Sequence, residues 1–251
     1  MNLHDALRAA ADYLHLNGDE LVQYVEETPT FGAHMPYGGM SIDREEGQFL
    51  YALVRALTPV RALEIGVFQG VSSAHILAAM DANETGELVS VDISDKGVMP
   101  KAGGRWSFIT ADATTADLPA ADFAYEDSDH QMPAVADILA KVKALRPRVV
   151  VSHDYYSHEL YADNVGFQVK MAFDNVFGGG NVLGVRWDNA PRGFGLWLNP
   201  DWQAPSEYTV NGNTITHNRA PRAGENGGVA VKVENPAPRK RTPAKKATTK
   251  R

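Results

Sequence analysis

Five acidic residues stand at or just after the ends of predicted β-strands along this chain. They are Glu64, Asp92, Asp112, Asp127 and Asp154. In an open parallel sheet the carboxyl ends of the strands share one edge, and ligands bind there. A rim of carboxylates suits hydroxyl groups, amines or a positive charge. It does not suit phosphates, which bind to amide donors, Lys or Arg.

The turn after the first predicted strand narrows the class of ligand. It reads Glu64-Ile-Gly-Val-Phe-Gln-Gly-Val-Ser72, so Gly66 and Gly70 allow a tight turn close to a ligand. It lacks the third glycine of a dinucleotide-binding G-x-G-x-x-G turn and the Gly-Lys-Ser/Thr of a P-loop. S-adenosylmethionine carries a ribose diol, an adenine amine and a sulfonium, and it fits both this turn and the acidic rim.

Strands alternating with helices would position these residues. Short apolar runs predict strands at 62–65, 88–91, 106–110, 122–125 and 148–152. Apolar residues at helical spacing predict helices around them, with a clear one at 134–145. The alternation predicts an α/β, Rossmann-like doubly wound sheet. Two last strands, at 181–187 and 193–198, predict a terminal antiparallel hairpin.

The charge distribution divides the chain into an acidic body and a basic tail. The 251 residues include 24 Lys and Arg, 31 Asp and Glu and no Cys, which excludes a disulfide scaffold and any Cys-ligated metal. Residues 219–251 hold ten Lys and Arg against two Asp and Glu and lack large apolar side chains, so we expect this tail to be disordered. The expected parts are an N-terminal helical cap (1–37), a cofactor-binding domain (38–200), an extension (201–218) and the tail.

The same composition gives expectations about location and partners. No apolar run approaches the roughly 18 residues of a membrane span. The N-terminus has neither the basic start nor the apolar core of a signal peptide. We therefore expect a cytoplasmic protein with no membrane partner. The basic tail allows a weak contact with nucleic-acid phosphates, and a solubilising extension is the alternative.

Several segments together resemble the class I S-adenosylmethionine-dependent methyltransferases, especially the catechol and caffeoyl-CoA O-methyltransferases and their antibiotic-tailoring relatives. The similar segments are 40–50, 63–73, 91–94, 111–113, 122–130 and 151–155. The resemblance spans roughly residues 38–200 and implies that they form a methyltransferase domain. It implies methyl transfer from S-adenosylmethionine to a small hydroxylated acceptor, such as a phenol or a sugar. Such relatives are often dimers through their N-terminal helices, which makes residues 1–30 a candidate homodimer interface.

The resemblance implies how the methionine part of the cofactor would bind. Gly66 and Gly70 would admit it, and Ser72 would hydrogen-bond its carboxylate. Glu64 would orient the turn and the cofactor's ammonium group. For Ser72, a helix cap is the structural alternative.

The nucleoside part would bind further along the same edge. By the resemblance, Asp92 would accept hydrogen bonds from both ribose hydroxyls. Asp112, Ala113 and Ser128 would lie beside the adenine. For Asp112, a purely structural place in a turn is the alternative.

A divalent metal is implied by many relatives, which hold one with two Asp and an Asn. Asp127 falls at the first position, and the later Asp-Asn pair falls on His153-Asp154, which is a departure from the pattern. Asp154 is a hard oxygen ligand suited to Mg²⁺, whereas His153 favours a softer metal or is no ligand at all. The candidate metal site is therefore Asp127, His153 and Asp154, with Mg²⁺ or another divalent ion.

Two histidines are candidates for the catalytic base. His130 falls where metal-dependent relatives carry a Lys near the acceptor, and an imidazole titrates near neutrality. His153 is the alternative base if it does not bind metal. Tyr155, Tyr156 and Trp187 are candidate walls of the acceptor pocket, with packing as the competing interpretation. The segment 31–40, broken by Gly and Pro, is a candidate lid.

Two other functions stay open at this point. An NAD-binding Rossmann oxidoreductase would use the same strand-turn-helix, although the glycine spacing argues against it. A noncatalytic nucleic-acid-associated protein would use the basic tail as a tether, although the acidic body disfavours a nucleic-acid groove in the fold itself.

Overall fold

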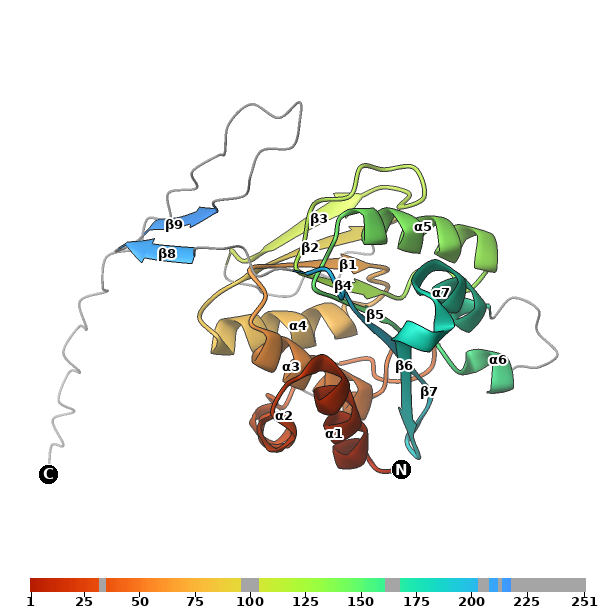
Figure 1. The fold of residues 1–251 in the computed structure, drawn as a ribbon, viewed down its shortest axis with the longest axis horizontal. Helices are drawn as coiled ribbons and strands as arrows, with labels where there is room; N and C mark the ends of the chain where they lie inside the picture. The colour runs from red at the N-terminus through yellow and green to blue at the C-terminus, as the bar shows by residue number, and fades with distance from the viewer. Residues whose placement is uncertain (32–34, 96–103, 161–167, 203–207, 212–213, 218–251) are drawn as a thin grey trace, which may run out of the picture. The chain divides into compact units, whose positions relative to one another are not determined.

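A seven-stranded sheet organises residues 1–202 of the computed structural model (Figure 1). The structure describes residues 1–31, 35–95, 104–160, 168–202, 208–211 and 214–217. The strand order is β3-β2-β1-β4-β5-β7-β6, and the first five strands are parallel. These are β1 (Arg61–Ile65), β2 (Glu87–Asp92), β3 (Trp106–Thr110), β4 (Phe123–Glu126) and β5 (Val149–Ser152). The predicted doubly wound sheet is confirmed.

The sheet ends in an antiparallel hairpin, as predicted. β6 (Val182–Trp187) pairs with β7 (Ala190–Leu198), and β7 also pairs antiparallel with β5. The connection between them is shorter than the sequence indicated, because β7 already begins at Ala190. Arg192, which was expected in the turn, is consequently a strand residue.

Helices cover both faces of the sheet. Figure 1 shows α1 to α4 gathered on one face and α5 and α7 on the other. The first group comprises α1 (Leu3–Leu14), α2 (Gly18–Glu27), α3 (Arg44–Leu57) and α4 (Val71–Ala82). The second comprises α5 (Met132–Ala144) and α7 (Val169–Phe177), with the short α6 (Ser157–Leu160) and the 3₁₀ turn η1 (Gly179–Asn181) beside them in sequence. The expected N-terminal helical cap is therefore present.

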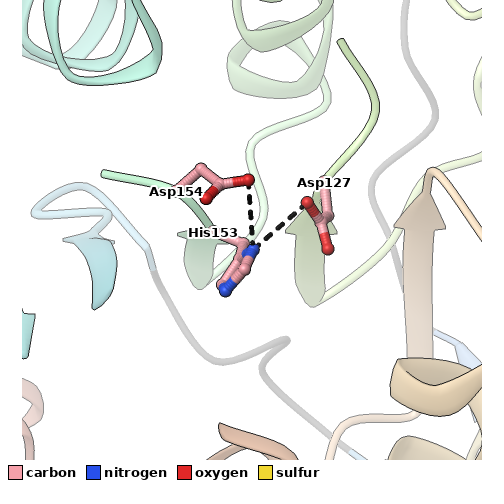
Figure 2. Close-up of side chains that lie close together, drawn as sticks. All are labelled: Asp127, His153 and Asp154. Carbon is pink, nitrogen blue, oxygen red and sulfur yellow. Dashed lines mark hydrogen bonds and ion pairs between the residues drawn. The ribbon is translucent and has the colours of Figure 1, made fainter. Parts of the chain in front are cut away.

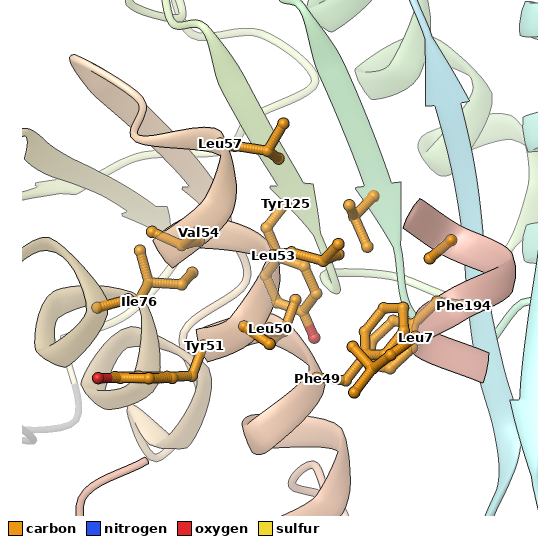
Figure 3. Close-up of a cluster of buried hydrophobic side chains, with 14 of the residues drawn as sticks. Leu7, Phe49, Leu50, Tyr51, Leu53, Val54, Leu57, Ile76, Tyr125 and Phe194 are labelled. Carbon is orange, nitrogen blue, oxygen red and sulfur yellow. The ribbon is translucent and has the colours of Figure 1, made fainter. Parts of the chain in front are cut away.

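Alternation along each strand explains why both faces are covered. Phe123 and Tyr125 of β4 join the apolar cluster on the side of α1 to α4, whereas Ala124 joins the cluster on the side of α5 and α7. In Figure 3, Phe49 and Leu53 of α3 lie with Tyr125 in the first cluster. Each such side chain contributes about 1.5–3 kcal/mol by leaving water, so α3 is held firmly on the sheet.

Residues 203–251 form a separate unit, of which the structure describes a two-stranded antiparallel hairpin. Its strands are β8 (Tyr208–Asn211) and β9 (Thr214–His217). The predicted extension at 201–218 thus contains regular structure that the sequence analysis did not foresee. The basic tail at 219–251 lies outside the described residues. Among the described helices, none has the length and apolar character needed to cross a membrane.

Candidate active site

From β1 the chain adds β2 and β3 on one side of the sheet and then β4 and β5 on the other, so the strand order reverses between β1 and β4. The carboxyl ends of β1 and β4 lie on either side of the site. The turn after β1 passes directly beside the end of β4. Gly66 has φ +87°, and a Cβ at this position would lie 2.1 Å from the carbonyl oxygen of Asp127. Only glycine satisfies both the backbone conformation and this close approach. The predicted cofactor turn and the predicted metal ligand Asp127 are therefore neighbours.

Glu64 holds the turn after β1 in place through hydrogen bonds from three serine side chains. Its carboxylate is fully buried and accepts hydrogen bonds from Ser72 Oγ at 2.6 Å, Ser73 Oγ at 2.6 Å and Ser90 Oγ at 2.5 Å. Burial raises the pKa of Glu64 above its ordinary value, although the three hydroxyl donors act in the opposite direction. Gly70, rather than Ser72, is the N-cap of α4. Glu64 therefore ties the start of α4 to β1 and β2, while the cofactor contacts of Glu64 and Ser72 stay predictions.

Asp92 braces the same turn from the end of β2. Its Oδ2 accepts hydrogen bonds from the backbone N–H of Val67 at 2.8 Å and of Phe68 at 3.1 Å. Its Oδ1 accepts from the N–H of Ser94 at 3.1 Å. A carboxylate has about four acceptor sites, so these three bonds leave one site, which is enough for one ribose hydroxyl. Ribose binding by Asp92 stays a prediction.

The three predicted adenine neighbours differ in exposure. Asp112 is exposed and accepts hydrogen bonds from Thr114 Oγ1 at 2.6 Å and Thr114 N–H at 2.9 Å, which lower its pKa. Ala113 is buried. Ser128 is half-buried, and its N–H and hydroxyl both donate to Glu126. Asp112 thus has the turn role that was weighed for it, and an adenine contact of any of the three stays a prediction.

Asp127, His153 and Asp154 converge at the ends of β4 and β5 (Figure 2). One potential ligand atom from each lies within 4.8 Å of the others. Figure 2 shows both carboxylates directed at His153 Nδ1, which is 3.3 Å from Asp127 Oδ1 and 3.4 Å from Asp154 Oδ2. The cause is the parallel register of the strands, which pairs Glu126 with Ser152 and so brings the following residues together.

His153 is buried among carboxylates, with 1% of its side chain exposed. Its Nε2 lies 3.0 Å from Oε1 of Glu46, a fully buried residue in the first turn of α3. Burial lowers the pKa of His153, but Asp127, Glu46 and Asp154 outweigh it and hold the pKa well above its ordinary value. Burial likewise raises the pKa of Glu46, but His153 outweighs burial and lowers it. The pair is therefore ionised despite its burial.

Arg192, on β7, adds a positive charge beside the carboxylates of this cluster. Its Nη2 donates to the carbonyl of Ser41 at 2.9 Å and to Glu46 Oε2 at 3.2 Å. Its Nε lies 4.0 Å from Asp154 Oδ1. Burial lowers the pKa of Arg192, and the charges of Glu46 and Asp154 more than reverse this.

Glu46 and Arg192 were not among the site residues predicted from the sequence. The one local signal for Glu46 was its place three residues after Asp43, which is the spacing of a helix capping box. That signal indicates a helix start and says nothing about a distant histidine. Arg192 gave no signal beyond its place near a predicted turn.

His130 lies at the open side of the cluster. Its Nε2 is 2.6 Å from Asp154 Oδ2, and 35% of its side chain is exposed. Burial lowers the pKa of His130, but the hydrogen bond and charge of Asp154 outweigh it and raise the pKa. Of the two predicted bases, His130 is the one that an acceptor can approach, because His153 is almost completely enclosed.

The predicted pocket aromatics are largely packing residues. Tyr155 is buried against Phe173, and its hydroxyl donates to Asp174. Trp187 is also buried. Tyr156 is half-buried, with the Arg186 guanidinium 4.3 Å from its ring centroid.

The predicted lid is described only in part, because residues 32–34 of the segment 31–40 lie outside the described residues. On either side of that gap, Phe31 and Tyr37 both contact the ring of the buried His75. The Tyr37 hydroxyl lies 3.4 Å from His75 Nε2. Lid movement stays a prediction.

Comparisons with known proteins agree with this geometry. Residues 63–155 match a family described as a methyltransferase domain, and residues 17–102 match one described as O-methyltransferase. A caffeoyl-CoA O-methyltransferase of Populus kitakamiensis is 30% identical over 146 residues, covering 45% of this chain and 61% of that protein. Caffeoyl-CoA O-methyltransferase 2 of Petunia hybrida is 30% identical over 107 residues, covering 35% and 43%. The chain thus spans about half the length of the curated relatives it matches.

Solved structures share the fold. A methyltransferase of Podospora anserina with bound SAH has a TM-score of 0.53 at 18% identity, covering 80% of this chain and 97% of that one. An O-methyltransferase of Bacillus cereus in complex with SAH has a TM-score of 0.51 at 16% identity, covering 74% and 90%. Family matches, relatives and fold together make this chain similar to methyltransferases, and its residues 17–102 are similar to the O-methyltransferases in particular.

Proposed function

We propose that this protein transfers the methyl group of S-adenosylmethionine to a hydroxyl oxygen of a small molecule. The observation that carries the proposal is the contact between two halves of one site. The glycine turn after β1 approaches the end of β4 so closely that a Cβ on Gly66 would strike the Asp127 carbonyl. A methyl donor bound at the turn would therefore face the cluster of Asp127, Asp154 and His130.

The cofactor half of the site would hold the donor through the turn and the acids around it. Gly66 and Gly70 keep side chains away from the methionine part, and Ser72 offers a hydroxyl oxygen to it. Asp92 accepts a hydrogen bond from a ribose hydroxyl, and its bonds to the Val67 and Phe68 N–H groups fix its carboxylate beforehand. A carboxylate that is already oriented loses less conformational entropy when it binds.

The acceptor half would orient a hydroxyl and remove its proton. Methyl transfer is an in-line displacement, so the acceptor oxygen must lie on the axis of the sulfonium–methyl bond. His130 takes the hydroxyl proton, and Asp154 orients the imidazole and stabilises the imidazolium that forms. The carbon–sulfur bond of the sulfonium breaks as the new oxygen–methyl bond forms, so S-adenosylhomocysteine leaves as a neutral thioether.

The residues present also fit a divalent metal. Ligands bound to one ion at about 2.0–2.2 Å lie roughly 3–3.5 Å apart, and the His153 Nδ1 distances to Asp127 and Asp154 are 3.3 and 3.4 Å. Two carboxylates and one imidazole suit Mn²⁺, Co²⁺ or Zn²⁺ at least as well as Mg²⁺. When bound, such an ion supplies charge that lowers the pKa of an acceptor hydroxyl.

Calorimetric titration of the purified protein with S-adenosylhomocysteine tests the cofactor half. We expect micromolar binding that Asp92→Ala abolishes. Methyl transfer to a panel of catechols and sugars, with and without Mg²⁺ or Mn²⁺, then tests the acceptor half. Absence of S-adenosylhomocysteine binding under every metal condition contradicts the proposal, and binding of a nicotinamide cofactor instead would support the oxidoreductase alternative.

Two further predictions concern partners. A weak nucleic-acid contact of residues 219–251 is tested by deleting them and measuring DNA and RNA affinity. A homodimer through residues 1–30 is tested by measuring the mass of the full chain in solution by light scattering. The catalytic proposal depends on neither outcome.

A further inference from the structure

Glu46 is a buried carboxylate whose two oxygens are both engaged. Oε1 lies 3.0 Å from His153 Nε2. Oε2 accepts hydrogen bonds from the backbone N–H of Asp43 at 2.7 Å and from Arg192 Nη2 at 3.2 Å. Because an unpaired buried charge is costly, these partners fix the orientation of the carboxylate.

That orientation determines which way the imidazole of His153 is used. An ionised carboxylate only accepts hydrogen bonds, so the ring nitrogen that faces Glu46 carries a hydrogen. The other nitrogen, Nδ1, then faces Asp127 and Asp154 at 3.3 and 3.4 Å. Phe194 packs against the imidazole with ring centroids 5.2 Å apart, which restricts rotation of the ring.

We propose that Glu46 is a positioning residue that makes His153 a metal ligand through Nδ1. It accepts the Nε2–H, so when metal binding displaces the proton of Nδ1, the lone pair of Nδ1 is directed at the point between Asp127 and Asp154. Metal-binding histidines almost always donate their second ring N–H to such a partner, and loss of that partner typically costs 10–100-fold in metal affinity. The inference rests on the proposed metal site. It gives α3 a role in that site, although the three candidate ligands follow β4 and β5.

The chain offers a matched control next to Glu46. Glu45 lies in the same turn of α3, but its carboxylate accepts hydrogen bonds from Trp187 Nε1 at 2.7 Å and Asn189 Nδ2 at 2.9 Å. Among the described residues, its carboxylate has no hydrogen bond or ion pair with Asp127, His153 or Asp154. Glu45→Gln therefore removes a charge from the same helix turn without changing the support of His153.

The experiment measures Mn²⁺ affinity of the full chain by calorimetry for the wild type, Glu46→Ala, Glu46→Gln and Glu45→Gln. We expect Glu46→Ala to weaken Mn²⁺ binding 10–100-fold. Glu46→Gln keeps an acceptor oxygen and should recover part of that loss. Glu45→Gln should bind Mn²⁺ like the wild type, and S-adenosylhomocysteine affinity should stay within about twofold in every variant that retains the wild-type circular dichroism spectrum.

A second readout follows the histidine itself and needs no variant. Nitrogen-15 NMR of the Zn²⁺-loaded wild type should show His153 protonated at Nε2 and coordinated through Nδ1. The opposite assignment overturns the inference even if the Glu46 variants do not fold. Equal Mn²⁺ affinity in the wild type and both Glu46 variants overturns it as well.

Failure of the proposed function can be distinguished from failure of this inference by the binding properties of the wild type. A wild type that binds S-adenosylhomocysteine but neither Mn²⁺ nor Zn²⁺ overturns the metal site and this inference while leaving methyl transfer intact. A wild type that binds metal but no S-adenosylhomocysteine overturns the methyltransferase proposal, and the Glu46 comparison still decides the role of Glu46.

Discussion

The carboxylate of Glu46 lies 3.0 Å from Nε2 of His153, although 107 positions separate the two residues in the chain. One belongs to the first turn of α3, and the other follows β5. Their contact joins the helical layer to the edge of the sheet where the chemistry is expected. The proposed acceptor half of the site therefore contains residues of both the helical layer and the sheet edge.

Replacing His130 should separate chemistry from binding. In His130→Gln the group that accepts the hydroxyl proton is lost, and general base catalysis contributes about 10²–10⁴-fold. We expect kcat to fall by that factor while S-adenosylhomocysteine affinity is unchanged, because His130 is not part of the cofactor turn. Steady-state kinetics and calorimetry measure the two quantities.

His158, on α6, provides the control for that substitution. His158→Gln removes an exposed imidazole and should leave kcat within about twofold. If His130→Gln retains full activity, the proton is removed by another group or by coordination alone, and the assigned base is wrong.

Gly66→Ala should damage both stability and cofactor binding. The new Cβ would meet the Asp127 carbonyl at 2.1 Å on a backbone with φ +87°. Left-handed strain and a clash with backbone atoms together should lower the free energy of unfolding by about 3 kcal/mol or more. Urea unfolding measures this change, and S-adenosylhomocysteine affinity should fall with it.

Gly39→Ala is the matched comparison for strain without a clash. Gly39 has φ +65°, and a Cβ there has nothing within 4 Å. We expect a loss of about 1 kcal/mol. Equal losses at Gly39 and Gly66 would mean that the contact with Asp127 costs nothing.

The buried His75 should make the fold sensitive to mild acid. Burial lowers its pKa to about 4, against about 6.5 in an unfolded chain. The unfolded state therefore binds the proton more readily, so His75 favours folding fully above pH 6.5 and loses this contribution as the pH falls from 6.5 towards 4. From pH 8 to pH 5 the loss is about 2 kcal/mol.

Urea unfolding of the wild type and His75→Gln at both pH values measures that contribution. The variant cannot titrate at this position, so its free energy of unfolding should fall by about 2 kcal/mol less between pH 8 and pH 5. The same pH dependence in both proteins would show that His75 titrates normally.

Gly47 and His75 should be energetically coupled. A Cβ on Gly47 would lie 2.4 Å from His75 Cε1, so Gly47→Ala overpacks the contact between α3 and α4. Alanine gains about 1 kcal/mol of helix propensity and overpacking costs about 1–3 kcal/mol, so we expect a net loss. In a His75→Ala background the same change should be neutral or stabilising, and a double-mutant cycle of urea unfolding measures the difference.

The sheet and part of the site were predictable because their signals are local. Apolar runs located β1 to β5, and the residues that follow parallel neighbours had to share an edge. That logic places Asp127 and Asp154 at the same edge of the sheet, and the family resemblance adds that they share a metal site. It also located the terminal hairpin, with an error of three residues at the start of β7.

The rest could not be predicted because it depends on contacts between distant segments. Glu46 has the sequence context of an ordinary helix start, and only the packing of α3 on the sheet buries it against His153. Arg192 was expected in a turn because the Asp-Asn-Ala-Pro run is typical of one, yet β7 begins before it and includes it. Trp187 has the residue type of a pocket wall, and its burial in the core is a tertiary outcome.

Glu46 has two structural roles. Its side chain accepts a hydrogen bond in the capping box at the start of α3, and it also contacts His153. Consider a chimera in which β4, β5 and the residues after them come from a relative while the N-terminal third stays native. In such a chimera Glu46 would face a residue at position 153 that it does not match. Engineering of acceptor preference in this protein should therefore transplant residues 41–57 together with the strand ends. In the language of protein design, the proposed acceptor site is one module made of segments that lie far apart in the sequence.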